Sequence, residues 1–282
     1  MTVIVAYALS EAVRRKVFLV VLVLTAIFLT LYGIANYYIF RDVTTLRVPE
    51  DVHVDARTFA AAFTLGLAMF ATLFLGVVLG VFLTIGVVSG DGERGLLQPL
   101  VARPVGRRSL LLGRFLAAGA VCASYVVVVY LATMVITGLI GEWWPHTRVW
   151  PGVLLAGSVL LMVALSLLGS VFLGSTANGI AVFMLFVSGL VGGLLGTIGH
   201  AIGSPTIERA ATAAAWVLPF EALYQDSLRL MTSGAGGFTG FLLQLGPFGG
   251  SYTGGWGVRV WAAGYLALVG VVALRAFARR DL

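Results

Sequence analysis

Charged side chains that could bind another molecule gather in one interior stretch of the chain, Ser89–Arg114. The stretch contains five arginines and two carboxylates: Arg94, Arg103, Arg107, Arg108, Arg114, Asp91 and Glu93. Its middle, residues 93–102, predicts a short amphipathic helix, because Leu96, Leu97 and Leu100 fall on neighbouring turns and Pro104 ends the pattern. A helix this short is not stable alone in water and needs a surface to pack on. We therefore expect it to dock on a separate soluble protein.

The sequence carries no catalytic motif. There is no GxxxxGK[ST] loop for phosphates, no HExxH pair for zinc and no GxSxG turn for a nucleophilic serine. The three histidines lie far apart, and the single cysteine, Cys122, stands in an apolar run where a small core residue is the expected role. We expect no catalytic residue, no metal site and no cofactor bound by this chain.

The composition places these residues in a membrane protein. Of the 282 residues, 60% are hydrophobic and 11% are charged, which is more apolar surface than a soluble domain of this size can bury. The net charge is +6. Its basic residues stand at the ends of apolar runs, as topology signals do, so nucleic acid is not an expected partner. The expected fold class is an all-α polytopic membrane protein with a single domain over residues 1–282.

Six apolar runs are long enough to cross a lipid bilayer as helices. They are residues 17–39, 59–88, 110–138, 153–173, 180–198 and 258–276. Residues 1–16 predict an amphipathic helix on the inner membrane surface, and residues 89–108 form the loop between the second and third runs. Residues 199–257 contain only short apolar pieces, broken by prolines and glycines, so short outer helices are expected there. A re-entrant path for this segment is allowed only where protein covers its backbone.

Two of the runs contain glycines at spacings that suit close helix contact. Gly76 and Gly80 lie in the second run, although glycine is abundant enough here to make this signal weak. The fifth run carries four: Gly189, Gly192, Gly193 and Gly196.

The distribution of charge sets the orientation. With six spans both termini lie on one side, and that side holds most of the basic residues and the minority of the acidic ones. The asymmetry predicts cytoplasmic termini and a cytoplasmic loop at residues 89–108, in the inner or plasma membrane. The cores of the six runs contain no Asp, Glu, Lys or Arg. This argues against an ion-driven carrier and against an enzyme with a buried acid–base pair, so energy must come from elsewhere.

The string from Gly86 to Phe115, GVVSGDGERGLLQPLVARPVGRRSLLLGRF, resembles the ABC-transporter permeases of the type-2 exporter class, especially the NosY-like branch. The matching positions are Glu93, Gly95, Leu96, Leu97, Leu100, Pro104, Arg107, Gly113 and Arg114. Three other parts are also similar: the basic N-terminal helix, the WVLPFEAL stretch around Pro219 and the terminal ARRDL. Residues 234–257 match no feature of that family.

The resemblance implies the transmembrane permease subunit of an ATP-binding cassette exporter. Such a subunit pairs with a second permease copy and with two cytoplasmic ATPase subunits, which bind ATP and Mg. The amphipathic helix would be the coupling helix, with its leucines in a cleft of the ATPase and its arginines paired with acidic residues at the rim. The coupling residues implied are Glu93, Arg94, Gly95, Leu96, Leu97, Leu100, Arg103, Pro104 and Arg107.

Several alternatives stay open. The loop at residues 89–108 is alternatively a solvated segment bound to lipid head groups. The same assembly alternatively transmits mechanical work to an outer accessory protein, or extracts lipid. A membrane-embedded enzyme and a channel or scaffold are further readings, and a co-purifying ATPase would separate them from the first.

Overall fold

The computed structural model describes residues 16–43, 55–84, 107–234, 239 and 255–279. In this part of the chain there are eight helices and no strands. Six of the helices are long and apolar enough to cross a membrane, as predicted. They are α2 (Lys16–Val43), α3 (Ala56–Thr84), α6 (Arg107–Gly141), α7 (Trp150–Phe172), α8 (Ser175–Ile202) and α12 (Gly255–Ala278). The all-helical fold with six candidate spans is therefore confirmed.

The spans continue past the apolar runs from which they were predicted, and α2 and α6 are two examples. α2 extends to Val43 and α6 covers Arg107–Gly141, whereas the runs end at residue 39 and cover residues 110–138. An α-helix bonds its own backbone whether or not its side chains are apolar, so a polar flank continues it beyond the hydrocarbon. The predicted interfacial helix, apart from Lys16, lies outside the described residues.

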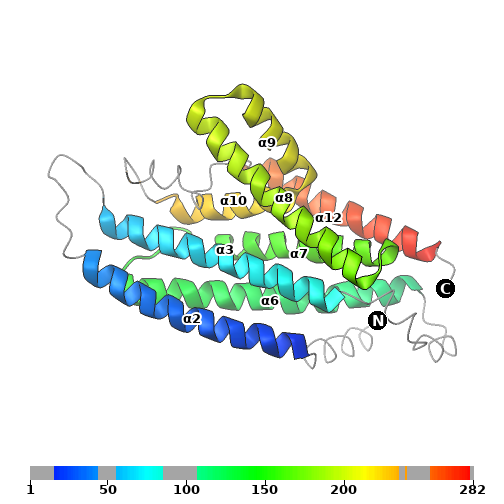
Figure 1. Cartoon of the computed structure of the whole chain (residues 1–282), viewed down its shortest axis with the longest axis horizontal. Coiled ribbons are helices and arrows are strands. Elements are labelled where there is room, and N and C mark those ends of the chain that lie inside the picture. The colour runs from blue at the N-terminus through cyan, green and yellow to red at the C-terminus, as the bar shows by residue number, and fades with distance from the viewer. Residues whose placement is uncertain (1–15, 44–54, 85–106, 235–238, 240–254, 280–282) are drawn as a thin grey trace.

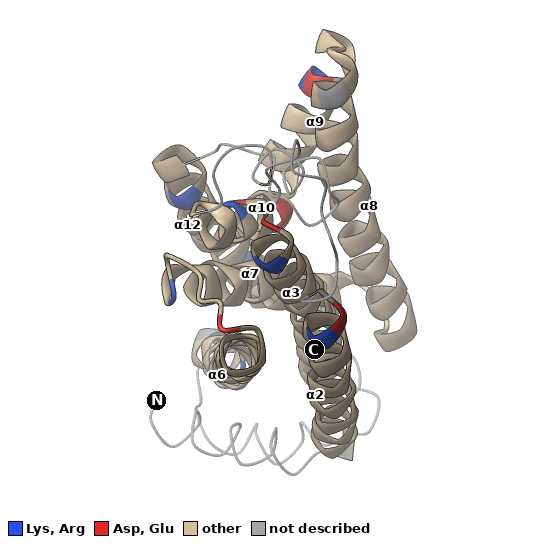
Figure 2. Cartoon of the chain, turned by 90° about the vertical axis from the view of Figure 1, so that its left-hand side faces the viewer, with Lys and Arg blue, Asp and Glu red and all other residues tan. Residues whose placement is uncertain are grey.

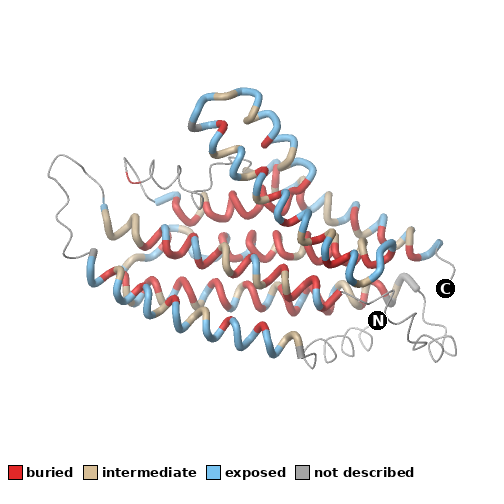
Figure 3. Tube along the Cα trace, in the orientation of Figure 1, coloured by how far each residue is buried: buried red, intermediate tan, exposed pale blue. Residues whose placement is uncertain are grey.

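α3, α6 and α7 form the centre of the bundle, where most residues are buried (Figure 1 and Figure 3). Gly76 and Gly80 stand where α3 approaches its neighbours. A Cβ atom at Gly80 would lie 2.6 Å from Val163 Cγ2, and one at Gly76 would lie 2.8 Å from Val126 Cγ2. The close contact that the glycine spacing predicted is thus present, and it joins α3 to both α6 and α7.

Buried hydroxyl and amide groups add hydrogen bonds between the spans. Thr25 on α2 and Tyr125 on α6 share a hydrogen bond of 2.6 Å. Thr84 on α3 and Ser166 on α7 share another of 2.6 Å, and Asn178 Nδ2 on α8 donates to the Ser166 backbone oxygen at 3.0 Å. Because hydrocarbon offers no water as a partner, such bonds favour one alignment of the helices.

Between α8 and α12 the chain forms two short helices, α9 (Pro205–Val217) and α10 (Pro219–Thr232). α8 ends at Ile202, and the φ of 65° at Gly203 turns the chain back. A proline begins each short helix. α9 returns alongside α8, and α10 lies on α7 between α8 and α12 (Figure 2). Alanines of α9 face the glycines of α8, which lets these two helices approach closely.

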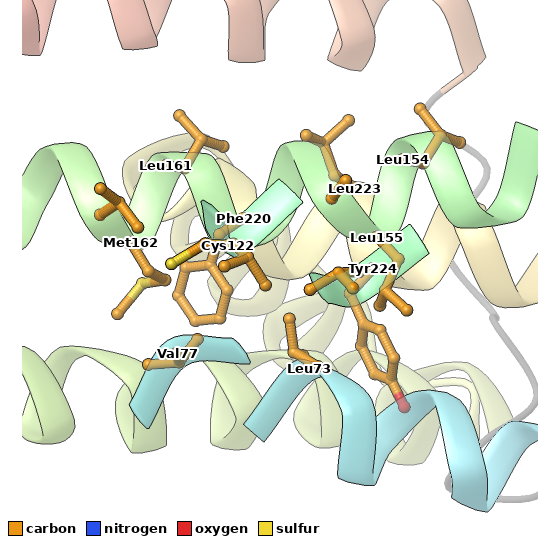
Figure 4. Packing of buried hydrophobic residues seen from close by; sticks show 14 of the residues in the cluster. Leu73, Val77, Cys122, Leu154, Leu155, Leu161, Met162, Phe220, Leu223 and Tyr224 are labelled. Atoms are coloured by element: carbon orange, nitrogen blue, oxygen red, sulfur yellow. The ribbon is translucent and has the colours of Figure 1, made fainter. Parts of the chain in front are cut away.

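α10 is enclosed by the other helices. Every residue from Pro219 to Leu228 is buried, as the tube of Figure 3 shows. Phe220, Leu223 and Tyr224 enter the central hydrophobic cluster beside Leu73 of α3 and Leu155 of α7 (Figure 4). A re-entrant segment is stable in a bilayer only where protein covers its backbone, and the surrounding helices cover α10 in this way.

Candidate functional site

Of the predicted coupling residues, only the last, Arg107, falls in a described helix. Glu93, Arg94, Gly95, Leu96, Leu97, Leu100, Arg103 and Pro104 lie outside the described residues. Arg107 is the first residue of α6, and its side chain also lies outside the described part. Residues 85–106 connect α3 and α6, two helices that pack against each other. The coupling role of this segment stays a prediction.

The structure brings together charged residues that the sequence analysis did not single out. Glu221 and Asp226 lie on α10 and are 4% and 0% exposed. Arg229 lies one turn after Asp226, and Arg259 lies near the start of α12. Figure 2 shows acidic and basic segments of α10 beside α12. The signal in the sequence was a short helix opened by Pro219 with polar side chains at helical spacing, in a segment otherwise broken by glycine.

Asp226 is bound by two arginines. Arg229 Nη2 lies 2.8 Å from Asp226 Oδ1, and Arg259 Nε lies 2.8 Å from Asp226 Oδ2. A buried carboxylate is costly unless its charge is paired and its oxygens accept hydrogen bonds, and here both oxygens do. This ion triad joins α10 to α12. Ser227 Oγ donates to the Pro151 backbone oxygen at 2.7 Å and joins α10 to α7.

Glu221, in contrast, makes no ion pair within the described residues. Its Oε1 accepts a hydrogen bond of 2.9 Å from Gln225 Nε2. Its Oε2 has no hydrogen-bond partner in that part of the chain, and neither does Gln225 Oε1. Burial raises the pKa of Glu221 from its usual 4.5 to about 7, while the bond from Gln225 acts in the opposite direction.

Glu221 and Gln225 line a cavity of about 240 Å³ between α8, α9 and α10. The α8 wall consists of the four glycines of the fifth apolar run, and the α9 wall consists of two alanines and Thr212. His200 and Glu208 line the cavity where it is exposed, with His200 Nδ1 3.5 Å from Glu208 Oε1. The cavity thus contains two carboxyl groups in walls built from small residues.

Gly193 provides the space that Glu221 occupies. A Cβ atom at Gly193 would overlap Glu221 Oε1 and lie 3.1 Å from Gln225 Nε2. Gly189 does the same for the Phe220 ring, with a Cβ atom 2.5 Å from Phe220 Cε1. The tight packing predicted for these glycines is confirmed, and its partners are the two short helices α9 and α10.

The chemistry open to this site is the binding of cations or hydrogen-bond donors. Among the described residues, no three His, Cys, Asp or Glu side chains lie close enough together to hold a metal ion. The buried Glu221 can be neutral or ionised, and its free oxygen can accept a hydrogen bond in either state.

A family model described as "ABC-2 family transporter protein" matches residues 2–282, nearly the whole chain. The chain belongs to the ABC-2 family of transporters. It is a multi-pass membrane protein and the permease subunit of an ABC transporter, and permeases of the ABC-2 family generally act with a partner ATP-binding subunit. The sequence resemblance is confirmed at this level, while the NosY-like branch stays a prediction. No curated protein matches this ABC-2 chain.

Proposed function

We propose that this ABC-2 permease is the transmembrane subunit of an exporter driven by ATP hydrolysis on a separate cytoplasmic ATPase. The observation that carries the proposal is the family match over residues 2–282, in a chain with six candidate spans. The sequence contains no phosphate-binding loop of its own. ATP and Mg therefore bind to the ATPase, and this chain binds neither.

Force from the ATPase enters through the coupling helix at residues 93–102. Leu96, Leu97 and Leu100 bury in the ATPase, while arginines around them pair with acidic residues at the rim of the cleft. Two features of the fold support this route. The loop connects α3 and α6, and the close contacts at Gly76 and Gly80 couple α3 to α6 and α7. A push on the loop is then transmitted to three packed helices together.

The proposed assembly contains two ATPase copies and a second copy of this permease, of the NosY-like branch. It lies in the inner or plasma membrane with both termini in the cytoplasm, as the positive-inside rule predicts. Met184, Val187 and Val191 are exposed apolar residues of α8. In the proposed assembly this face of α8 contacts a partner helix or lipid.

The test is co-purification with the ATPase when both proteins are produced together. We expect wild-type permease to retain the ATPase and the Leu96→Asp/Leu97→Asp variant to lose it while still inserting into the membrane. Gln98→Asp is the matched control, because it adds charge to the same predicted helix at a polar position. Retention of the ATPase by the double variant would contradict the coupling role.

A reconstituted complex then separates the proposed exporter from its mechanical alternative. Export predicts ATP-dependent movement of a solute or lipid across proteoliposomes. ATP turnover that depends on an outer accessory protein, with no cargo moved, would favour mechanotransmission instead.

A further inference from the structure

We propose that the cavity between α8, α9 and α10 binds the protonated amine group of a ligand, with Glu221 and Gln225 as the acceptors. Binding is a property of this chain alone. Its interpretation as a cargo site, which would make amine-bearing molecules the substrate class, rests on the proposed export function.

The first support is the pair of acceptor atoms without a donor. Glu221 Oε2 and Gln225 Oε1 have no hydrogen-bond partner in the described residues, and both side chains are at least nine-tenths buried and line the cavity. The amide of Gln225 has a defined orientation, because its Nε2 donates to Glu221 Oε1 at 2.9 Å. A primary ammonium group carries three N–H donors and no acceptor, so it complements this pair. A carboxylate or phosphate offers no donor and would be repelled.

The second support is charge. The described residues that line the cavity include Glu221, Glu208 and His200 but no lysine or arginine. Asp226, only one residue after Gln225, is paired with two arginines, and these three side chains together have a net charge of +1. An ionised Glu221 has no such compensation, and a buried carboxylate is stable only with a proton or a cation beside it. A protonated amine supplies that cation.

The third support is size. A cavity of about 240 Å³ is below the ~300–1,000 Å³ typical of sites for drug-sized ligands. It fits an amine group with a short apolar stem against glycine and alanine walls. Ordered water is the competing occupant, because each water needs only ~30 Å³ and a few polar partners.

The test uses the purified full-length chain in lipid nanodiscs at about pH 8, where the probe amine is protonated. Benzylamine, benzyl alcohol and benzoate share one apolar stem and differ in charge. Calorimetric titration, with empty nanodiscs subtracted, should show benzylamine bound about tenfold more tightly than benzyl alcohol and no benzoate bound.

Glu221→Gln should weaken benzylamine binding about tenfold, because it removes the charge and keeps the shape. Glu208→Gln, where the cavity is exposed, should change binding by no more than about threefold, because solvent screens that charge. Thermal unfolding of Glu221→Gln checks that the variant is folded. Equal binding of the three probes, or an unchanged affinity in Glu221→Gln, would show that the apolar stem and not the amine is bound. Absence of benzylamine binding would show a cavity that holds only water, and each of these results would overturn the proposal.

These outcomes are separate from those that test the proposed function. If the ATPase co-purifies with wild type while benzylamine does not bind, only the amine site is wrong. If benzylamine binds while no ATPase associates, the export function is wrong and the binding site remains.

Discussion

Arg259 of α12 donates a hydrogen bond from Nε to Oδ2 of Asp226 on α10, over 2.8 Å. Asp226 is fully buried, whereas the Arg259 side chain is 19% exposed. The two residues are 33 positions apart, and residues 240–254, which lie outside the described part of the chain, come between them. This contact therefore holds the middle of α10 against the last span, α12.

We expect Arg259→Gln to lower the free energy of unfolding by about 2 kcal/mol. The loss should be smaller than for a fully buried pair, because Arg229 still binds Asp226 and Arg259 is partly exposed. Thermal unfolding in nanodiscs would measure it. Arg209→Gln is the control, since Arg209 is an exposed residue of α9 and should change stability little.

A double-mutant cycle tests whether the contact itself is responsible. Asp226→Asn combined with Arg259→Gln should destabilise the protein by less than the sum of the two single variants, because each single variant already breaks the same pair. Strict additivity would show that the two side chains act independently.

The stability of the protein should also depend on the protonation of Glu221. Its pKa is raised in the folded protein, so the folded state binds the proton more tightly than the unfolded state does. The stabilisation of the folded state by this proton is fully present below pH 4.5 and is lost as the pH rises to about 7. The loss in the free energy of unfolding is about 3 kcal/mol in total. The groups facing Glu221 are Gln225 and Tyr224 on its own helix and the glycines of α8. His200 and Glu208 stand where the cavity is exposed.

Unfolding measured from about pH 5 to pH 8 in wild type and in Glu221→Gln would isolate this contribution, because every other titrating group is common to both. We expect wild type to lose stability relative to the variant as the pH rises. Parallel curves would mean that Glu221 is not the group responsible.

The spans were predictable from the sequence, and the buried charges were not. A helix such as α7, Trp150–Phe172, follows from a run of apolar residues of the right length, since the bilayer demands one. α10 mixes Phe220, Leu223 and Leu228 with Glu221 and Asp226, so its average hydropathy indicates neither a span nor a loop. Whether Asp226 can be buried depends on Arg259, and only tertiary packing brings Arg259 to it.

The contacts of the α8 glycines could be predicted in part from the sequence. Their spacing predicted close contact on one face of the helix, and that contact exists. The spacing did not show that the partners are two short helices later in the chain rather than another span. For the same reason, Gly193 could not be linked to Glu221 from the sequence.

Two of these glycines provide a matched pair of substitutions. Gly193→Ala places a methyl group on the carboxyl of Glu221, whereas the methyl group of Gly196→Ala meets Ala211 Cβ at an ordinary 3.4 Å. We expect Gly193→Ala to destabilise the protein by about 2 kcal/mol through overpacking. Gly196→Ala should be neutral or stabilising by up to ~1 kcal/mol through helix propensity. Thermal unfolding of both variants measures the two changes in stability, and equal changes would contradict the close packing at Gly193.

Arg107 offers the last test, at the point where the predicted coupling helix meets α6. We expect Arg107→Glu to weaken ATPase binding about tenfold, because an ion pair at the rim of the contact becomes a repulsion. Arg108→Glu reverses the same charge on the next residue, which is not among the implied coupling residues, and should weaken binding less. Affinity of the purified permease for its ATPase, measured at low and high salt, is the readout.

The wild-type advantage over Arg107→Glu should shrink at high salt, because salt screens exposed charge pairs. If the two variants bind the ATPase with equal affinity, Arg107 has no specific role in the coupling surface, and the leucines alone form that contact.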